Sequence, residues 1–180
     1  FLDHVRVPKE NLVGELHQGW TCAKYLLGHE RTGIAGIGSC KQQLQRAKRL
    51  MEQLSFSGES HFQQRLAQFE MELMALEYTA LRLLSPHQRS RTPEVEASML
   101  KVRGTELRQA IYELLVDIAG PDALPFSESA QYLDHLDEAV VPESLVALAA
   151  NCLDSRKLTI YGGTNEVQRN LIWRAALQAY

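Results

Sequence analysis

The feature that most constrains the fold is the recurrence of apolar residues at intervals of three and four along most of the chain. This spacing places apolar side chains on one face of an α-helix. The helices that it predicts cover residues 18–54, 59–84, 93–119, 142–153 and 164–178. Residues 121–142 are expected to be mostly irregular, with a short helix at 129–139. Because short loops between long amphipathic helices favour antiparallel neighbours, we predict an all-α fold: an antiparallel up-and-down four-helix bundle with an extra C-terminal helix.

The opening of the chain is the exception to this pattern. Residues 1–8 read as an extended stretch that ends at Pro8, and residues 11–19 read as a loop with two glycines. A strand with no partner elsewhere in the chain indicates that a β-rich part lies upstream. We therefore expect residues 1–17 to be the end of a missing β-domain with its linker, and residues 18–180 to be the helical bundle.

Composition excludes several classes of protein. The net charge of −3 gives no electrostatic case for binding nucleic acid, and no apolar run approaches the roughly 20 residues of a membrane span. The three cysteines and six histidines show no metal-ligand spacing, so we expect no metal site, and free thiols in a reducing compartment. A basic cluster at residues 41–49 alternates with apolar residues at helical spacing, which is typical of a solvated helix face.

Glu30 is the most informative single residue. It falls on the apolar stripe formed by Ala23, Leu27, Ile34 and Ile37, so a carboxylate interrupts a face that should be buried. Burial raises the pKa of a carboxyl group, as a general base working near neutral pH requires. The alternative is a structural ion pair with Arg31 or with a basic residue of another helix.

Three glycines follow Glu30 within the same predicted helix, at positions 33, 36 and 38. Each glycine in a helix interior costs roughly 0.5–1 kcal/mol relative to alanine. Such a cost makes sense if another backbone, or a flat ligand, approaches this face closely. Simple helix–helix contact is an equally good interpretation.

A second constellation surrounds the pair Gly162 and Gly163, which permits backbone torsions closed to other residues. Thr164 or Asn165 can cap the helix that follows, and Asn165 with Gln168 has the form of a capping box. The amide groups exposed at such a helix N-terminus suit a phosphate or the polar edge of a cofactor. Most turns of this composition are nevertheless only turns.

Two stretches resemble the acyl-CoA dehydrogenase family closely. Residues 1–15 with Gly19 and Trp20 are similar to the family's exit from its middle β-domain, and residues 161–170, Tyr-Gly-Gly-Thr-Asn-Glu-Val-Gln-Arg-Asn, are similar to its C-terminal signature. Softer matches at residues 30–35 and 98–106 lie between them. The four matches stand in the family's order and span the whole chain.

The resemblance also bears on Glu30. Many members of the family carry the catalytic glutamate between the tyrosine and the glycine of the signature, where this chain has Gly162. A second group has glycine there and carries the glutamate on the first bundle helix, just before an arginine. Glu30, followed by Arg31, matches the second group, so the interrupted stripe and the resemblance select the same residue.

The resemblance implies an FAD-dependent α,β-dehydrogenation of an acyl-CoA thioester. Glu30 would remove the α-proton while flavin N5 takes the β-hydride. Arg31 and Tyr161 would line the acyl-CoA cleft. The cofactor-binding positions that it implies are Gly162, Gly163, Thr164 and Glu166.

The resemblance further implies partners and a cellular compartment. The expected electron acceptor is an electron-transferring flavoprotein, and the chain is expected to associate through its bundles into a homodimer or homotetramer. The expected compartment is the bacterial cytoplasm or the mitochondrial matrix, the former preferred. The chain alone is expected to be inactive, and a non-catalytic structural or oligomerisation subunit of a similar complex is the alternative function.

Two family motifs are absent from this chain. Many members have Arg-x-x-Phe-Gly after the first helix, where the arginine and the phenylalanine reach the FAD of a neighbouring subunit, whereas residues 53–59 here lack that arginine. The glutamine-glycine-glycine FAD loop after the third helix is replaced by residues 117–121, Asp-Ile-Ala-Gly-Pro. The departures put in question how FAD is held and shared between subunits.

Overall fold

The computed structural model describes residues 1–55, 60–84, 94–124 and 143–178. Within these ranges the protein is helical and contains no strand, which confirms the predicted all-α class. Short 3-10 turns occur at Lys9–Asn11 (η1), Gly120–Ala123 (η3), Glu143–Leu145 (η6) and Ser155–Thr159 (η7). The α-helices are α1 (Gly19–Ile34), α2 (Ile37–Gln53), α3 (Ser60–Leu84), α4 (Glu94–Ala119), α5 (Leu148–Asp154) and α6 (Asn165–Gln178). None of the described helices is long and apolar enough to cross a lipid bilayer.

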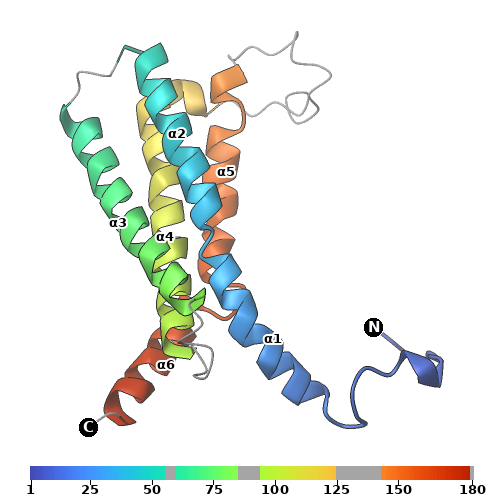
Figure 1. The fold of residues 1–180 in the computed structure, drawn as a ribbon. Helices are drawn as coiled ribbons and strands as arrows, with labels where there is room; N and C mark the ends of the chain where they lie inside the picture. The colour runs from blue at the N-terminus through green and yellow to red at the C-terminus, as the bar shows by residue number, and fades with distance from the viewer. Residues whose placement is uncertain (56–59, 85–93, 125–142, 179–180) are drawn as a thin grey trace.

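Helix α4 is the centre of the bundle. It packs against α1, α2, α3, α5 and α6, and Figure 1 shows α2, α3 and α5 running alongside it. Six of its large apolar side chains are fully or almost fully buried, namely Leu100, Leu107, Ile111, Leu114, Leu115 and Ile118. Full burial of one such side chain stabilises a fold by about 1.5–3 kcal/mol, so this helix supplies a large share of the core.

The predicted helix at residues 18–54 is two helices, and the prediction of one continuous helix is wrong. Gly36, between α1 and α2, has φ +65°, a left-handed conformation that L-residues with a Cβ adopt at a cost of 1–2 kcal/mol. Among the side chains of α1 that the structure describes, none is buried. Figure 1 shows α1 leaving the bundle while α2 stays within it.

A close contact between two backbones fixes this break. A Cβ atom on Gly104 of α4 would lie 2.6 Å from the Cα atom and 2.9 Å from the carbonyl carbon of Ala35. Beyond the neighbouring helix backbone, no heavy atom of the described residues lies within 4 Å of where a Cβ atom would stand on Gly33 or Gly38. The close approach expected from the glycines at 33–38 therefore occurs at Ala35, and the glycine that permits it belongs to α4.

Other boundaries also differ from the prediction. Helix α5 begins at Leu148 rather than near residue 142, since Ala147 has φ 60° and interrupts the helical path after η6. Residues 1–8 form no strand and are exposed, and His4 within them has φ 50°. The helix predicted at 129–139 lies outside the described residues.

Replacing Gly104 with alanine tests the backbone contact. The added methyl group meets backbone atoms that cannot rotate away, so α1, α2 or α4 must shift. We expect Gly104→Ala to lower the free energy of unfolding by about 1–3 kcal/mol, as overpacked cores do. Urea unfolding followed by circular dichroism measures this.

The matched control is Gly38→Ala on α2, where an added methyl group meets no neighbour. It should leave stability unchanged or raise it by up to about 1 kcal/mol, because alanine favours the helix. Equal losses in the two variants would show that the contact at Ala35 is unimportant.

Candidate functional site

The candidate site forms around the bend between η7 and α6. Gly162 and Gly163 have φ +65° and +84°, two consecutive left-handed residues that reverse the chain before α6 begins. A Cβ atom on Gly162 would collide with Cδ1 of Ile34, and one on Gly163 would collide with Nε2 of Gln168. Both glycines are therefore favoured by their backbone torsions, whereas the two side-chain ends that they contact are flexible and could shift.

The contact with Ile34 brings the end of α1 against this bend. Glu30 precedes Ile34 by four residues, so the two share one face of α1, and the rise of 1.5 Å per residue puts Glu30 about 6 Å further along the axis. The structure thus places Glu30 about one helical turn from the contact with Gly162. Residues 30 and 162, the two positions that the resemblance to acyl-CoA dehydrogenases singles out for a glutamate, therefore lie on adjacent elements.

Glu30 is exposed, however, and the expectation that its carboxylate lies buried in an apolar stripe is wrong for this chain. The residues of that stripe on α1 are themselves only partly buried at Ala23, Leu27 and Ile34. Helix α1 lies at the margin of the bundle, where Figure 1 shows it leaving the other helices. The exposed Glu30 is therefore accessible to a ligand.

A buried lysine anchors the other side of the bend. Lys101 of α4 is fully buried, and its Nζ atom donates a hydrogen bond of 2.7 Å to Oδ1 of Asn165, the first residue of α6. Nδ2 of Asn165 donates to Oγ1 of Thr105 over 3.2 Å, and this hydroxyl donates to the carbonyl of Lys101 over 2.8 Å. The start of α6 is thereby fixed to the middle of α4.

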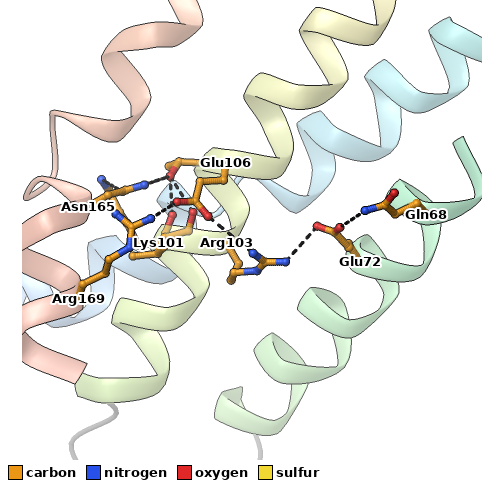
Figure 2. Close-up of polar contacts among 9 residues, drawn as sticks. Gln68, Glu72, Lys101, Arg103, Glu106, Asn165 and Arg169 are labelled. Atoms are coloured by element: carbon orange, nitrogen blue, oxygen red, sulfur yellow. Dashed lines mark hydrogen bonds and ion pairs between the residues drawn. The ribbon is translucent and has the colours of Figure 1, made fainter. Parts of the chain in front are cut away.

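Figure 2 shows how this contact extends across the bundle. Arg169 of α6 pairs with Glu106 of α4. Arg103, one turn earlier on α4, lies 3.8 Å from Glu106 and 3.3 Å from Glu72 of α3. Most of these outer pairs are exposed, and each contributes at most about 1 kcal/mol. The buried Lys101–Asn165 hydrogen bond is therefore the main polar link between α4 and α6.

The structure decides which residue caps α6. The Oγ1 atom of Thr164 accepts a hydrogen bond of 3.3 Å from the backbone N–H of Val167, as an N-cap residue does. Asn165 bonds to Lys101 instead, so the predicted capping box of Asn165 with Gln168 is wrong. Gln168 is fully buried, and its amide has no hydrogen-bond partner among the described residues.

Glu166 adds a negative charge to the same helix terminus. Hydrogen bonds from its own backbone N–H and from the Thr164 hydroxyl lower the pKa of its carboxyl group. The carboxylate is exposed and can accept further hydrogen bonds from a ligand. Because it occupies the positive end of α6, this terminus suits the hydroxyl or amino groups of a ligand better than a phosphate.

The predicted site residues fall into three groups. Gly162, Gly163, Thr164 and Glu166 lie together at the bend, with Glu30 near them through Ile34. Tyr161 precedes the bend and is exposed. Arg31 belongs to α1, but its side chain lies outside the part that the structure describes.

Sequence reasoning missed Lys101 as the anchor of the bend. One available signal was its position on the face of Ala97, Gly104 and Thr105, where small residues leave room for a buried lysine stem. Its partner Asn165 is 64 residues away. No local pattern could have joined the two.

The fold agrees with the comparisons to known proteins. The family model described as "Acyl-CoA dehydrogenase, C-terminal domain" matches residues 17–177. The chain belongs to this family.

Two curated relatives are similar to the chain in sequence, and a solved structure is similar to it in fold. The chain is 28% identical over 187 residues to acyl-CoA dehydrogenase FadE26 of Mycobacterium tuberculosis, covering 98% of the chain and 44% of the relative. It is 25% identical to the mitochondrial long-chain specific acyl-CoA dehydrogenase of Rattus norvegicus, covering 97% and 38%. The Tcur3481-Tcur3483 steroid ACAD structure superimposes with a TM-score of 0.78 at 22% identity, covering 99% and 44%. The chain thus spans about two fifths of the length of these proteins.

The hydrogen bond between Lys101 and Asn165 gives a testable effect of pH on stability. Burial lowers the pKa of Lys101 below its unfolded value of 10.5. At a pH below the pKa of Lys101 in the folded protein, the lysine is protonated in both the folded and the unfolded state. The folded state then carries the full free-energy cost of burying the charge. Between the two pKa values the unfolded state binds more protons, so the free energy of unfolding should rise with pH.

Asn165→Ala removes the acceptor of the buried ammonium group. We expect a loss of about 1.5–3 kcal/mol at pH 7, the usual worth of a hydrogen bond to a charged group, and a steeper rise of stability toward pH 10. Asn170→Ala, at an exposed asparagine of the same helix, is the control and should change little. Urea unfolding between pH 7 and 10 measures both, and an unchanged pH profile in Asn165→Ala would contradict the role of this bond.

Proposed function

We propose that the chain is the C-terminal helical domain of an FAD-dependent acyl-CoA dehydrogenase that introduces a double bond between Cα and Cβ of an acyl-CoA thioester. The observation that carries this proposal is the contact of Ile34 with Gly162. It puts the only glutamate of α1 beside the glycine bend of the family's signature. Family membership supports the reaction class, and the geometry supports the choice of Glu30.

Glu30 acts as the general base in this proposal. Its carboxylate takes the proton from Cα, the electrons of that C–H bond form the new double bond, and a hydride leaves Cβ. Bound FAD would supply the acceptor for this hydride. Gly162 carries no side chain that could compete for the α-proton, and the exposure of Glu30 leaves its carboxylate open to the substrate.

The remaining predicted site residues are proposed to bind and orient the substrate and the cofactor. Tyr161 and Arg31 are proposed to line the acyl-CoA cleft. Gly162 and Gly163 are proposed to approach the cofactor through their backbone, and Thr164 and Glu166 offer oxygen atoms that accept hydrogen bonds. These acceptors fit the hydroxyl or amino groups of FAD rather than its diphosphate.

A general base of this kind needs a dry environment, which the described residues do not provide around Glu30. We propose that residues 1–17 connect the bundle to an upstream β-domain that covers the open side of α1. Exposed apolar residues of α1 agree with such a cover, namely Trp20, Tyr25 and Leu26. The isolated chain is accordingly expected to be inactive.

The proposed partners follow the family. An electron-transferring flavoprotein would reoxidise the flavin, and the chain would form a homodimer or homotetramer in the cytoplasm or the mitochondrial matrix. A stripe of α3 formed by Met71, Met74, Tyr78 and Leu81 is more than half exposed at every position. Such a stripe supports association through the bundle. It equally supports the alternative function, a non-catalytic oligomerisation subunit.

Replacing Glu30 with glutamine in the full-length protein separates the two functions. Glutamine preserves size but cannot accept the α-proton, so we expect the variant to retain FAD and to lose anaerobic flavin bleaching by acyl-CoA by at least about 1,000-fold. Losses of this order are at the upper end of the contribution of one general base. A panel of thioesters of different chain length and branching identifies the substrate.

The matched control is Glu96→Gln at an exposed glutamate of α4. It should bleach at the rate of the unmodified protein. Bleaching by Glu30→Gln at an undiminished rate would refute the assigned base. Absence of bleaching by any thioester in the unmodified protein would favour the oligomerisation subunit.

A further inference from the structure

Arg108 of α4 carries a positive charge that the proposed reaction does not use. Its side chain is half-buried, and its Nε atom is buried without a hydrogen-bond partner. Arg108 forms no ion pair among the described residues, whereas Arg103 of the same helix pairs with Glu72 and Glu106. Removing a cation from water without a partner is costly. The surroundings of Arg108 must therefore compensate its charge in another way.

The Arg108 side chain lies across the break between α1 and α2. A Cβ atom on Gly36 would stand 3.0 Å from Nη1 and 3.4 Å from Cδ of Arg108, so the guanidinium and its stem lie against the left-handed residue of the break. Burial raises the pKa of the Cys40 thiol in α2 to about 11, and the nearby charge of Arg108 opposes that rise. Gly104, one turn earlier on α4, contacts the backbone of Ala35. Two successive turns of α4 thus hold two successive residues of the break.

The C-terminal end of α1 can compensate the charge of Arg108. Helix α1 ends at Ile34, and the last carbonyl groups of a helix lack partners within it. The carbonyl oxygen of Ile34 lies 3.5 Å from the same Cβ position on Gly36 that Nη1 of Arg108 approaches to 3.0 Å. The partial negative charge of a helix C-terminus stabilises a cation placed beside it, most of all in partly buried surroundings. Arg108 and the end of α1 therefore stabilise each other.

This compensation exists only while the helix is broken. The apolar spacing of residues 18–54 predicts one continuous helix, in which the carbonyl groups of residues 31–34 would bond to the N–H groups of residues 35–38. A continuous helix would leave the charge of Arg108 uncompensated. Arg108 therefore favours the broken form, and the break sets the direction of the helix that carries Glu30.

We propose that Arg108 is a positioning residue for Glu30. Its guanidinium holds the break in the geometry in which Ile34 contacts Gly162, so that the turn of α1 bearing Glu30 stands near the glycine bend. Arg108 acts through the backbone of α1 and is not itself a catalytic residue. The consequence for the reaction rests on the proposed function, whereas the effect on the position of α1 does not.

A distance measurement in the full-length protein tests the effect on α1 without any substrate. One spin label is placed on Cys22, which is exposed on α1, and the other on Asn170→Cys, at an exposed position of α6. Cys40 is buried, so Cys152→Ser and serine at any accessible upstream cysteine leave only these two labelled thiols.

The expected change follows from the length of α1. Cys22 lies about 18 Å from Ile34 along the helix, so a tilt of about 10° displaces its label by about 3 Å. We expect Arg108→Met, which keeps an apolar stem without the charge, to shift or broaden the distance distribution by at least this amount. Arg108→Lys retains the charge and should keep the distribution of the unmodified protein. Circular dichroism checks that both variants retain their helical content.

Anaerobic flavin bleaching measures the consequence for Glu30. A misplacement of about 1 Å can cost about 100-fold in rate, so Arg108→Met should lower the maximal bleaching rate by about 10- to 100-fold. The thioester concentration that gives half of the maximal rate should change by less than about threefold, because Arg108 does not touch the substrate. Arg108→Lys should keep the maximal rate within about threefold of the unmodified protein, since it retains a cation at the end of α1.

The matched control is Arg82→Met, the same substitution at an exposed arginine of α3. It should leave both the label distance and the bleaching rate unchanged. An unchanged distance or an undiminished bleaching rate in Arg108→Met would overturn the inference. An equal shift in Arg82→Met, or a shifted distance in Arg108→Lys, would overturn it as well.

These outcomes are distinguishable from failure of the proposed function. If Glu30→Gln bleaches at an undiminished rate while Arg108→Met still shifts α1, the assigned base is refuted and the role of Arg108 in holding the break stands. If no thioester bleaches the flavin of the unmodified protein, the label distances alone decide whether Arg108 holds α1.

Discussion

The contact between the backbone of Ala35 and the side-chain-free surface of Gly104 determines the arrangement of the candidate site. It holds the break between α1 and α2 against the central helix, where Gly36 turns the chain in a left-handed conformation. This contact sets the direction in which α1 leaves the bundle. Since Ile34 is the neighbour of Ala35 and contacts the glycine bend, the position of Glu30 relative to the bend also depends on this contact.

The second constraint is the buried hydrogen bond of Lys101 with Asn165. A buried ammonium group is costly unless it is hydrogen-bonded, and this lysine sits where it fixes the first residue of α6. The hydrogen bond to Asn165 offsets part of this cost and fixes the position of the bend formed by Gly162 and Gly163. The two constraints act on opposite sides of the bend, through Ile34 on one side and Asn165 on the other, and both originate on α4.

Glu30 and the basic cluster show that the burial of a charged residue depends on where its helix lies in the bundle as well as on the sequence pattern. Glu30 interrupts an apolar stripe, which predicted burial, but α1 lies at the margin of the bundle and the carboxylate is exposed. The basic cluster at residues 41–49 suggested a solvated face, yet Arg46 is half-buried against η6 while Lys41 and Lys48 pair with α3. In both cases the helical face was predicted correctly, and what packs against that face was not.

The sequence by itself determined the helical class and the extents of α3, α4 and α6, because apolar periodicity and turn residues act over a few neighbouring positions. The association of Glu30 with the glycine signature was implied by the family resemblance and stays a prediction. Only the tertiary structure decided that the first helix breaks at Gly36, that Asn165 binds Lys101 instead of capping α6, and that Glu30 is exposed. These features depend on contacts between residues 60 or more positions apart, such as Ala35 with Gly104. Local propensity cannot encode such contacts, since they arise only when α4 is in place at the centre of the bundle.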